Sequence, residues 1–193
     1  MTSARRAAAA TALAALAASV SCSDAGRAPD PPKACDAQCR DQVALRALRE
    51  SLKLIYNLTL QGKPVGKQDQ TIPCPKGGRA RVFGEATANA TQGSTFVSLT
   101  YVLEGCGYDV KNTKPEETYS LKASGAITQN GTIAVQPTAT TALVIKSDAV
   151  AIEGTVYDSP PVDYREPTCK VDATQDGNRL AGDMCGRRTG VDL

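Results

Sequence analysis

The chain has 193 residues, which leaves room for one domain with a substantial core once an export signal is set aside. It carries 22 Lys and Arg against 20 Asp and Glu, and residues 1–21 hold two of the arginines and no acid, so the remainder is neutral. No global charge is left to attract nucleic acid, and we expect none as a partner. The chain contains no histidine, which excludes Ser-His-Asp and Cys-His catalysis and histidine-bearing zinc sites.

Residues 1–21 have the layout of a secretory signal peptide, with a basic start and an Ala- and Leu-rich run at residues 7–18. That run is too short to span a bilayer permanently. The segment ends at Ser19-Val20-Ser21-Cys22, which resembles the lipobox of bacterial lipoproteins, although Ser19 stands where Leu is typical. The resemblance implies that Cys22 is diacylated and anchors the protein to a membrane. A plain signal peptide, cut nearby without lipidation, is the alternative.

The cysteine count supports the same interpretation. Seven is an odd number, and exported chains usually pair their thiols. Setting Cys22 aside leaves six disulfide candidates: Cys35, Cys39, Cys74, Cys106, Cys169 and Cys185. The last two flank a turn and the middle two flank the first two predicted strands, which would leave the first two for each other, but other connectivities stay open. Ser23 stands where Asp would retain a lipoprotein in the inner membrane, so the outer membrane is favoured.

Residues 22–34 are polar and proline-rich and predict a disordered tether, followed by a single domain at residues 35–193. The domain begins with an amphipathic helix at about residues 41–59, capped by Asp36 or Asp41. Its buried face is predicted from Leu45, Leu48, Leu52 and Ile55. Its exposed side is predicted from Arg46, Arg49, Glu50 and Lys53.

The clearest strand pattern covers residues 95–103. Side chains two apart share one face of a strand, so the apolar set here predicts a buried face made of Val97, Leu99, Tyr101 and Leu103. The strand is expected to end at Gly105-Cys106-Gly107, where glycines permit a sharp exit.

Further strand patterns continue to residue 185. They cover residues 79–86, 118–129, 132–145, 149–157, 168–172 and 179–185. Asn130-Gly131 and Ser147-Asp148 are predicted hairpin turns, residues 61–78 a loop, and residues 158–167 a proline-rich loop or partner contact. The sequence therefore predicts a β-rich α+β domain, with one N-terminal helix on an antiparallel sheet of about six to eight strands stabilised by disulfides.

The segment at residues 172–183 resembles a calcium-binding loop of the EF-hand type. The residues at the ligand positions are Asp172, Thr174, Asp176, Asn178 and Asp183, with Gly177 at the sixth position. Arg179 stands where an apolar residue is expected, and an Asp replaces the usual final Glu. The same residues make a good hairpin turn, which we favour over a metal site.

No phosphate loop, dinucleotide fingerprint or nucleophile motif occurs, and we expect neither a cofactor nor catalysis. The layout resembles that of small bacterial surface lipoproteins, which implies a non-catalytic envelope protein that is structural or binds a ligand or a protein or glycan partner. One alternative is a calcium-stabilised adhesion or binding module. Another is a glycan hydrolase that uses two carboxylates among Glu85, Glu104, Asp109, Glu116, Glu117 and Glu153. Exposed binding platforms are sought among Tyr108, Tyr119, Tyr157 and Tyr164.

Overall fold

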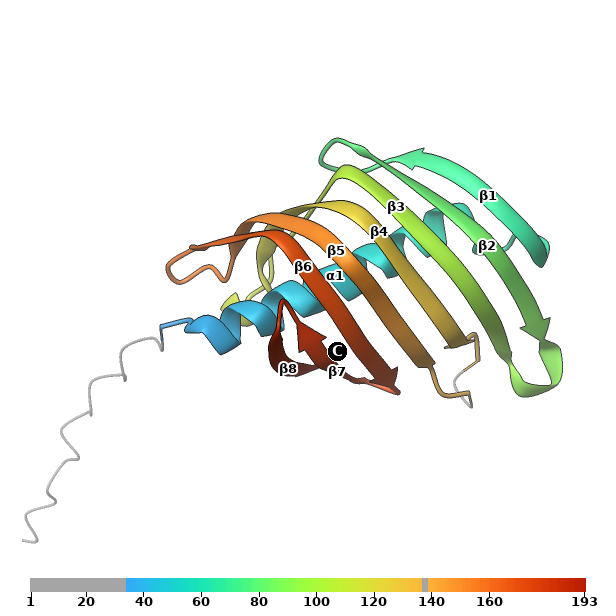
Figure 1. The fold of residues 1–193 in the computed structure, drawn as a ribbon. Helices are drawn as coiled ribbons and strands as arrows, with labels where there is room; N and C mark the ends of the chain where they lie inside the picture. Colours follow the sequence, from blue (N-terminus) through green and yellow to red (C-terminus); the bar gives the residue numbers. More distant parts are fainter. Residues whose placement is uncertain (1–33, 137–138) are drawn as a thin grey trace, which may run out of the picture. The chain divides into compact units, whose positions relative to one another are not determined.

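The computed structural model describes residues 34–136 and 139–193. They form one α-helix followed by eight antiparallel strands in a single sheet, and the strands neighbour one another in the order of the chain (Figure 1). The expected α+β fold, with a helix on a disulfide-stabilised antiparallel sheet, is confirmed. The predicted signal peptide, Cys22 and nearly all of the predicted tether lie outside the described residues.

The elements are α1 (Ala37–Thr59), β1 (Gly66–Pro73), β2 (Arg79–Asn89), β3 (Ser94–Val110), β4 (Tyr119–Ala134), β5 (Ala142–Val156), β6 (Val162–Asp176), β7 (Arg179–Met184) and β8 (Arg187–Asp192). Short 3₁₀ turns at Ala90–Gln92 and Pro115–Glu117 lie between β2 and β3 and between β3 and β4.

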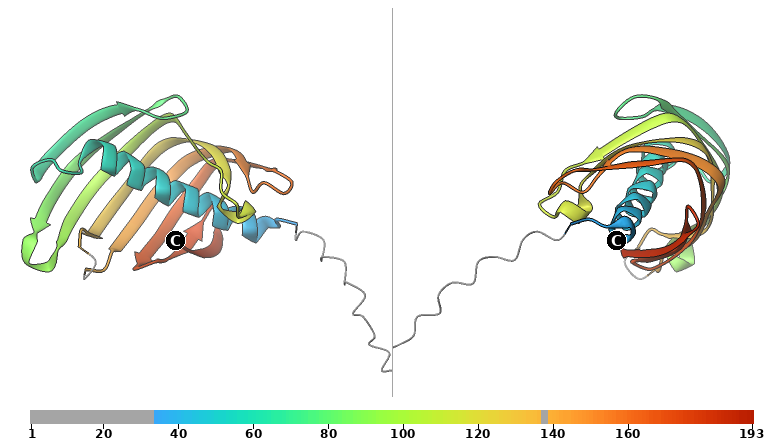
Figure 2. Two further views of the ribbon diagram at one scale, coloured as in Figure 1. Left: turned by 180° about the vertical axis from the view of Figure 1, so that it is seen from behind. Right: turned by 60° about the vertical axis from the view of Figure 1, so that its left-hand side comes forward.

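The helix lies along the concave face of the sheet, and the sheet curls around it (Figure 2). The predicted apolar faces meet in one core, which contains Leu45, Leu48, Leu52 and Ile55 of α1 and Val97, Leu99, Tyr101 and Leu103 of β3. The apolar repeats of the helix and of β3 were therefore interpreted correctly. When one face is buried, apolar residues recur every two positions in a strand and about every 3.6 positions in a helix. The buried side chains of α1 pack against the inner face of the sheet.

The helix begins earlier than predicted, at Ala37 rather than at residue 41. Asp36 is the cap: its Oδ1 accepts a hydrogen bond from the Cys39 backbone N–H at 2.9 Å. The Cys35–Cys39 disulfide closes the same first turn. Asp41, the other candidate cap, lies inside the helix and is buried.

Two strands at the ends of the sheet were missed. β1 lies within the predicted loop at residues 61–78, and β8 follows the last predicted strand. β1 pairs only with β2, so it is an edge strand whose side chains are half-exposed or exposed, and it needs no apolar alternation. The sequence of such a strand carries little of the signal by which buried strands are recognised.

The predicted hairpin at Asn130-Gly131 is wrong. Gly131 lies inside β4 and pairs with Val97 of β3 and Leu143 of β5. Its φ of 129° is open to glycine but strained for other residues, and a Cβ there would lie 2.2 Å from the Ala142 carbonyl oxygen. The glycine therefore serves a close approach between strands, and the connection to β5 comes after Ala134.

The predicted turn at Ser147-Asp148 is also wrong, because β5 continues through it with a shift in register between Ser147 and Val150. The Ser147 hydroxyl donates to the Ala126 carbonyl at 2.7 Å, which ties this bulge to β4. β3 likewise continues past Gly105 to Val110. The predicted proline-rich loop is shorter than expected, since β6 begins at Val162.

Three disulfides join Cys35 to Cys39, Cys74 to Cys106, and Cys169 to Cys185. The second ties the turn after β1 to β3, and the third ties β6 to the turn between β7 and β8. This connectivity is the one considered from the sequence, in which the middle two cysteines pair, the last two pair, and the first two are left for each other. Three disulfides in one small domain indicate an oxidising, extracellular environment.

Candidate ligand-binding site

A cleft of about 620 Å³ lies beside the C-terminal half of α1. This helix cleft is lined by side chains of α1 and of the inner faces of β4 and β6, chiefly Arg49, Lys53, Tyr56, Gln129, Ile133 and Gln175. Gln129 pairs in register with Leu99 and Ile145, and Gln175 with Leu143 and Leu180. Both amides therefore stand in rows of the sheet that are otherwise apolar and buried.

Arg49 is the central charged group of the helix cleft. The residue is only 7% exposed, although the sequence predicted it on the exposed side of the helix. Its Nε donates to Gln175 Oε1 at 2.5 Å, and Gln175 Nε2 in turn donates to the Gly177 carbonyl at 2.7 Å. This chain of hydrogen bonds fixes the plane of the guanidinium.

The charge of Arg49 is not matched by a carboxylate. Within residues 34–136 and 139–193, no ion pair joins Arg49 to an acid, and the carboxylate of neighbouring Glu50 pairs with Lys53 at 3.5 Å. Burial lowers the pKa of Arg49, and the negative charge of Glu50 opposes that shift. Arginine stays charged in proteins, so an uncompensated cation remains beside the cleft.

Two other buried polar atoms lie near this cation without a partner in the described part of the chain. Gln129 is 1% exposed and its Oε1 accepts no hydrogen bond. The hydroxyl of Tyr101 is similarly unpaired, and burial raises the pKa of this phenol while the charge of Arg49 lowers it. Buried polar groups in folded proteins are normally satisfied by protein, water or ligand. The arrangement thus offers a fixed cation and an open acceptor to a bound molecule.

A second, smaller cavity of about 260 Å³ adjoins the helix cleft. This side cavity shares Tyr56, Asn57, Gln61, Ile133 and Ala134 with the cleft. Its remaining lining includes the apolar side chains of Leu60, Val65, Ala86 and Val135. Val65 and Val135 are 53% and 67% exposed, which leaves an apolar rim open to solvent. The two cavities together have a polar end at Arg49 and an apolar end at this rim.

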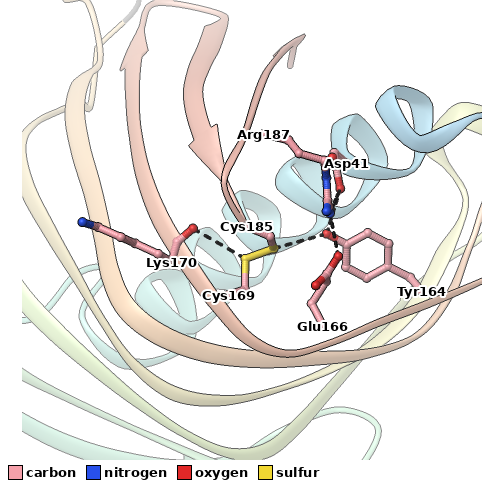
Figure 3. The surroundings of a disulfide bond; sticks show 7 residues. All are labelled: Asp41, Tyr164, Glu166, Cys169, Lys170, Cys185 and Arg187. Atoms are coloured by element: carbon pink, nitrogen blue, oxygen red, sulfur yellow. Dashed lines mark hydrogen bonds and ion pairs between the residues drawn. A yellow bond between two sulfur atoms is a disulfide. The ribbon is translucent and has the colours of Figure 1, made fainter.

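A polar cluster at the other end of α1 has the opposite character (Figure 3). Asp41, which is 2% exposed, accepts hydrogen bonds from Arg187 Nε at 2.5 Å, from Arg187 Nη2 at 2.8 Å and from the Tyr164 hydroxyl at 3.1 Å. Arg187 also bonds Glu166 at 2.6 Å, and the Tyr164 hydroxyl lies 3.7 Å from Cys185 Sγ. The Asp41 carboxylate is thus compensated by Arg187, and the cluster joins α1 to β6 and β8 through groups that are already partnered.

The residues of the calcium-loop alternative lie along the β6–β7 hairpin instead of in one loop. Asp172, Thr174 and Asp176 lie along β6, Asn178 is in the turn, and Asp183 is on β7. At a rise of roughly 3.3 Å per residue, the first and third of these are about 13 Å apart, whereas one calcium ion holds its ligands within about 2.6 Å. Asp172 instead pairs with Lys146 at 3.1 Å. Among the described residues, no group of three His, Cys, Asp or Glu side chains could hold a metal ion.

The carboxylates considered for glycan hydrolysis do not line the helix cleft. Glu104 pairs with Arg79, Asp109 with Lys76, and Glu117 with Arg46 and Lys114. The other three are Glu85 of β2, Glu116 before β4 and Glu153 of β5.

The tyrosines considered as exposed platforms lie mostly in the core. Tyr108, Tyr119 and Tyr164 are buried, and Tyr157 is half-buried. The rings of the three buried tyrosines belong to the core instead of presenting a surface to a partner.

Sequence reasoning missed the residues that define the helix cleft. Gln129 and Gln175 sit two positions after the buried Ile127 and Ala173, so strand alternation alone places them on the inner face. A polar residue at such a position is a usable signal. No such signal marks Arg49, because an arginine on a helix is normally exposed.

Comparisons of the chain with protein-family profiles, with curated proteins and with solved structures found no match. Among the described residues, no helix has both the length and the apolar character that crossing a membrane requires.

Proposed function

We propose that this protein is an exported, lipid-anchored, non-catalytic binding protein of the bacterial cell envelope, with the helix cleft as its ligand site. The observation that carries the binding role is Arg49: a buried cation, fixed by Gln175, that no carboxylate of the described chain neutralises. Proteins rarely bury a charge without a partner. A bound ligand supplies the missing partner.

The anchoring role is supported by the cysteines. Six of the seven form disulfides, so Cys22 remains as the odd thiol, directly after a segment with the layout of a signal peptide. An unpaired thiol is unusual in an exported protein, and acylation would remove it.

The absence of histidine and the makeup of the cleft favour binding over catalysis. The described lining supplies mainly amides and two cations, with Glu50 as the one carboxylate, and such groups orient a ligand by hydrogen bonds and charge. General acid-base catalysis near neutral pH needs a group that titrates there, most often histidine.

Intact mass spectrometry of the protein from native membranes tests the anchor. We expect acylation at Cys22, no alkylation of the native protein, and six alkylated cysteines after reduction. An unacylated mature chain would overturn the anchor while leaving the binding role to be decided by the next experiment.

Ligand-observed NMR with a mixed set of neutral, cationic and anionic small molecules tests the binding role. Asn57 is exposed on α1 and lines both cavities, so Asn57→Trp should obstruct them without disturbing the core. Leu58→Trp is the matched control, since Leu58 is 58% exposed on the same turn and lines neither cavity. We expect at least one molecule to bind the native protein and the control but not Asn57→Trp. Binding to none, or equal binding to all three proteins, would refute the proposed site.

A further inference from the structure

We infer that the ligand is an amphipathic anion, whose carboxylate or similar oxyanion binds Arg49 and whose apolar tail occupies the side cavity. The inference rests on the proposed binding role of the helix cleft and adds the chemical class of the ligand.

The head group is assigned from the geometry of Arg49. Its Nε is already used by Gln175, and its two Nη groups make no hydrogen bond to any residue of the described chain. A guanidinium held in this way presents a fork of donors whose spacing matches two oxygens of one carboxylate or phosphate. An anion bound there would neutralise the buried charge.

The charges around the two cavities agree with an anion. The charged side chains in their described lining are Arg49, Lys53, Lys63 and Glu50, three cations against one acid. A cationic ligand would meet repulsion from the first three. A neutral ligand would leave the Arg49 charge without a partner.

The tail is assigned from the side cavity. It shares Tyr56 and Ile133 with the helix cleft and is bordered by Leu60, Val65 and Val135. Val65 and Val135 are more than half exposed in the free protein, and an apolar chain lying between them would cover both. A linear tail fits the route from the helix cleft of about 620 Å³ into the side cavity of about 260 Å³, where it can lie against the apolar side chains of the mixed lining.

The apolar contribution predicts how affinity depends on chain length. Each buried methylene should tighten binding about fourfold. A straight-chain acid with four more methylenes than butyrate should therefore bind about 10- to 200-fold tighter, the lower value applying where part of the tail stays in solvent.

Calorimetric titration with octanoate, octanamide and butyrate tests both parts of the ligand. We expect octanoate to bind best, octanamide to bind at least tenfold more weakly because it lacks the charge, and butyrate to bind weakly because it lacks the tail. Vesicles of phosphatidylglycerol form a further arm that offers the same chemistry as a lipid. Binding of octanoate or of the vesicles supports the inference when it depends on Arg49. Binding of octanoate alone identifies the ligand as a free anion, and binding of the vesicles identifies it as a lipid.

Arg49→Met removes the charge but keeps an unbranched apolar side chain, and should weaken octanoate binding at least tenfold. Arg40→Met is the matched control: it makes the same change on α1, about 14 Å along the helix axis from Arg49, and should leave binding unchanged. Equal affinity for octanoate and octanamide would overturn the anionic head while leaving the helix cleft as a binding site. Equal affinity for octanoate and butyrate would overturn the tail, and undiminished binding by Arg49→Met would overturn the role of Arg49.

Discussion

Asp41 and Arg49 lie two turns apart on α1, yet their charges meet opposite surroundings. Asp41 receives three hydrogen bonds from Arg187 and Tyr164, whereas Arg49 holds only the amide of Gln175. The first arrangement stabilises the fold. The arrangement at Arg49 costs stability, which we explain by a role of its charge in ligand binding.

Asp41→Asn should lower the free energy of unfolding by about 2 to 4 kcal/mol, because Arg187 loses its buried counter-charge and Tyr164 its ionised acceptor. Urea denaturation monitored by circular dichroism measures the change. Asp69→Asn is the control, since it breaks an exposed pair with Arg81 that solvent screens, and it should lower the free energy of unfolding far less. Equal losses in the two variants would show that the Asp41 cluster is no more than a surface ion pair.

Arg49→Met should leave the ligand-free protein at least as stable as the native one. The variant loses one hydrogen bond to Gln175 but no longer desolvates an unpaired charge, and the second effect is the larger. Thermal unfolding in the absence of ligand measures the difference. A substantial fall in the unfolding temperature would mean that Arg49 is structural.

At the scale of elements, glycines inside strands allow neighbouring strands to approach closely. Gly131→Ala should destabilise the protein by more than about 2 kcal/mol, since its φ is strained for alanine and the Cβ would lie 2.2 Å from the Ala142 carbonyl oxygen. Gly62→Ala separates the two causes, because Gly62 has a φ of 76° but no atom within 4 Å of the added Cβ. It should cost about 1 kcal/mol in the same denaturation assay. A Gly131 variant no worse than the Gly62 variant would contradict a close approach at β4.

The elements also show what a sequence can and cannot predict. The helix and the buried face of β3 were predictable because burial on one face imposes a regular period. β1 was not, because an edge strand is under no such constraint, and Asn130-Gly131 misled because glycine serves a close approach between strands as readily as it serves a turn. The helix cleft was predictable only in its glutamines, since the burial of Arg49 is a property of the curled sheet around it.

At the scale of the whole molecule, five of the six tyrosines should make the fold sensitive to alkali. Burial is the largest cause that raises the pKa of Tyr56, Tyr101, Tyr108 and Tyr164 and raises the pKa of Tyr119 to about 12. Above about pH 10 the unfolded chain loses phenolic protons that the folded chain retains, so stability is full below that pH and falls as pH rises further. Urea midpoints at about pH 8 and about pH 11 should show the decline, and phenolate absorbance should appear late in the folded protein. Six tyrosines titrating together near the ordinary value would refute this.

The disulfides join cysteines that are consecutive along the chain: Cys35 to Cys39, Cys74 to Cys106 and Cys169 to Cys185. A polypeptide that crosses a membrane from its N-terminus exposes its cysteines in that order. If the proposed acylation has removed the thiol of Cys22, an oxidase that links each remaining thiol to the next one to emerge would produce the native set directly, before the later strands have arrived. The protein should then mature with an oxidase alone, without an isomerase to correct mispaired thiols.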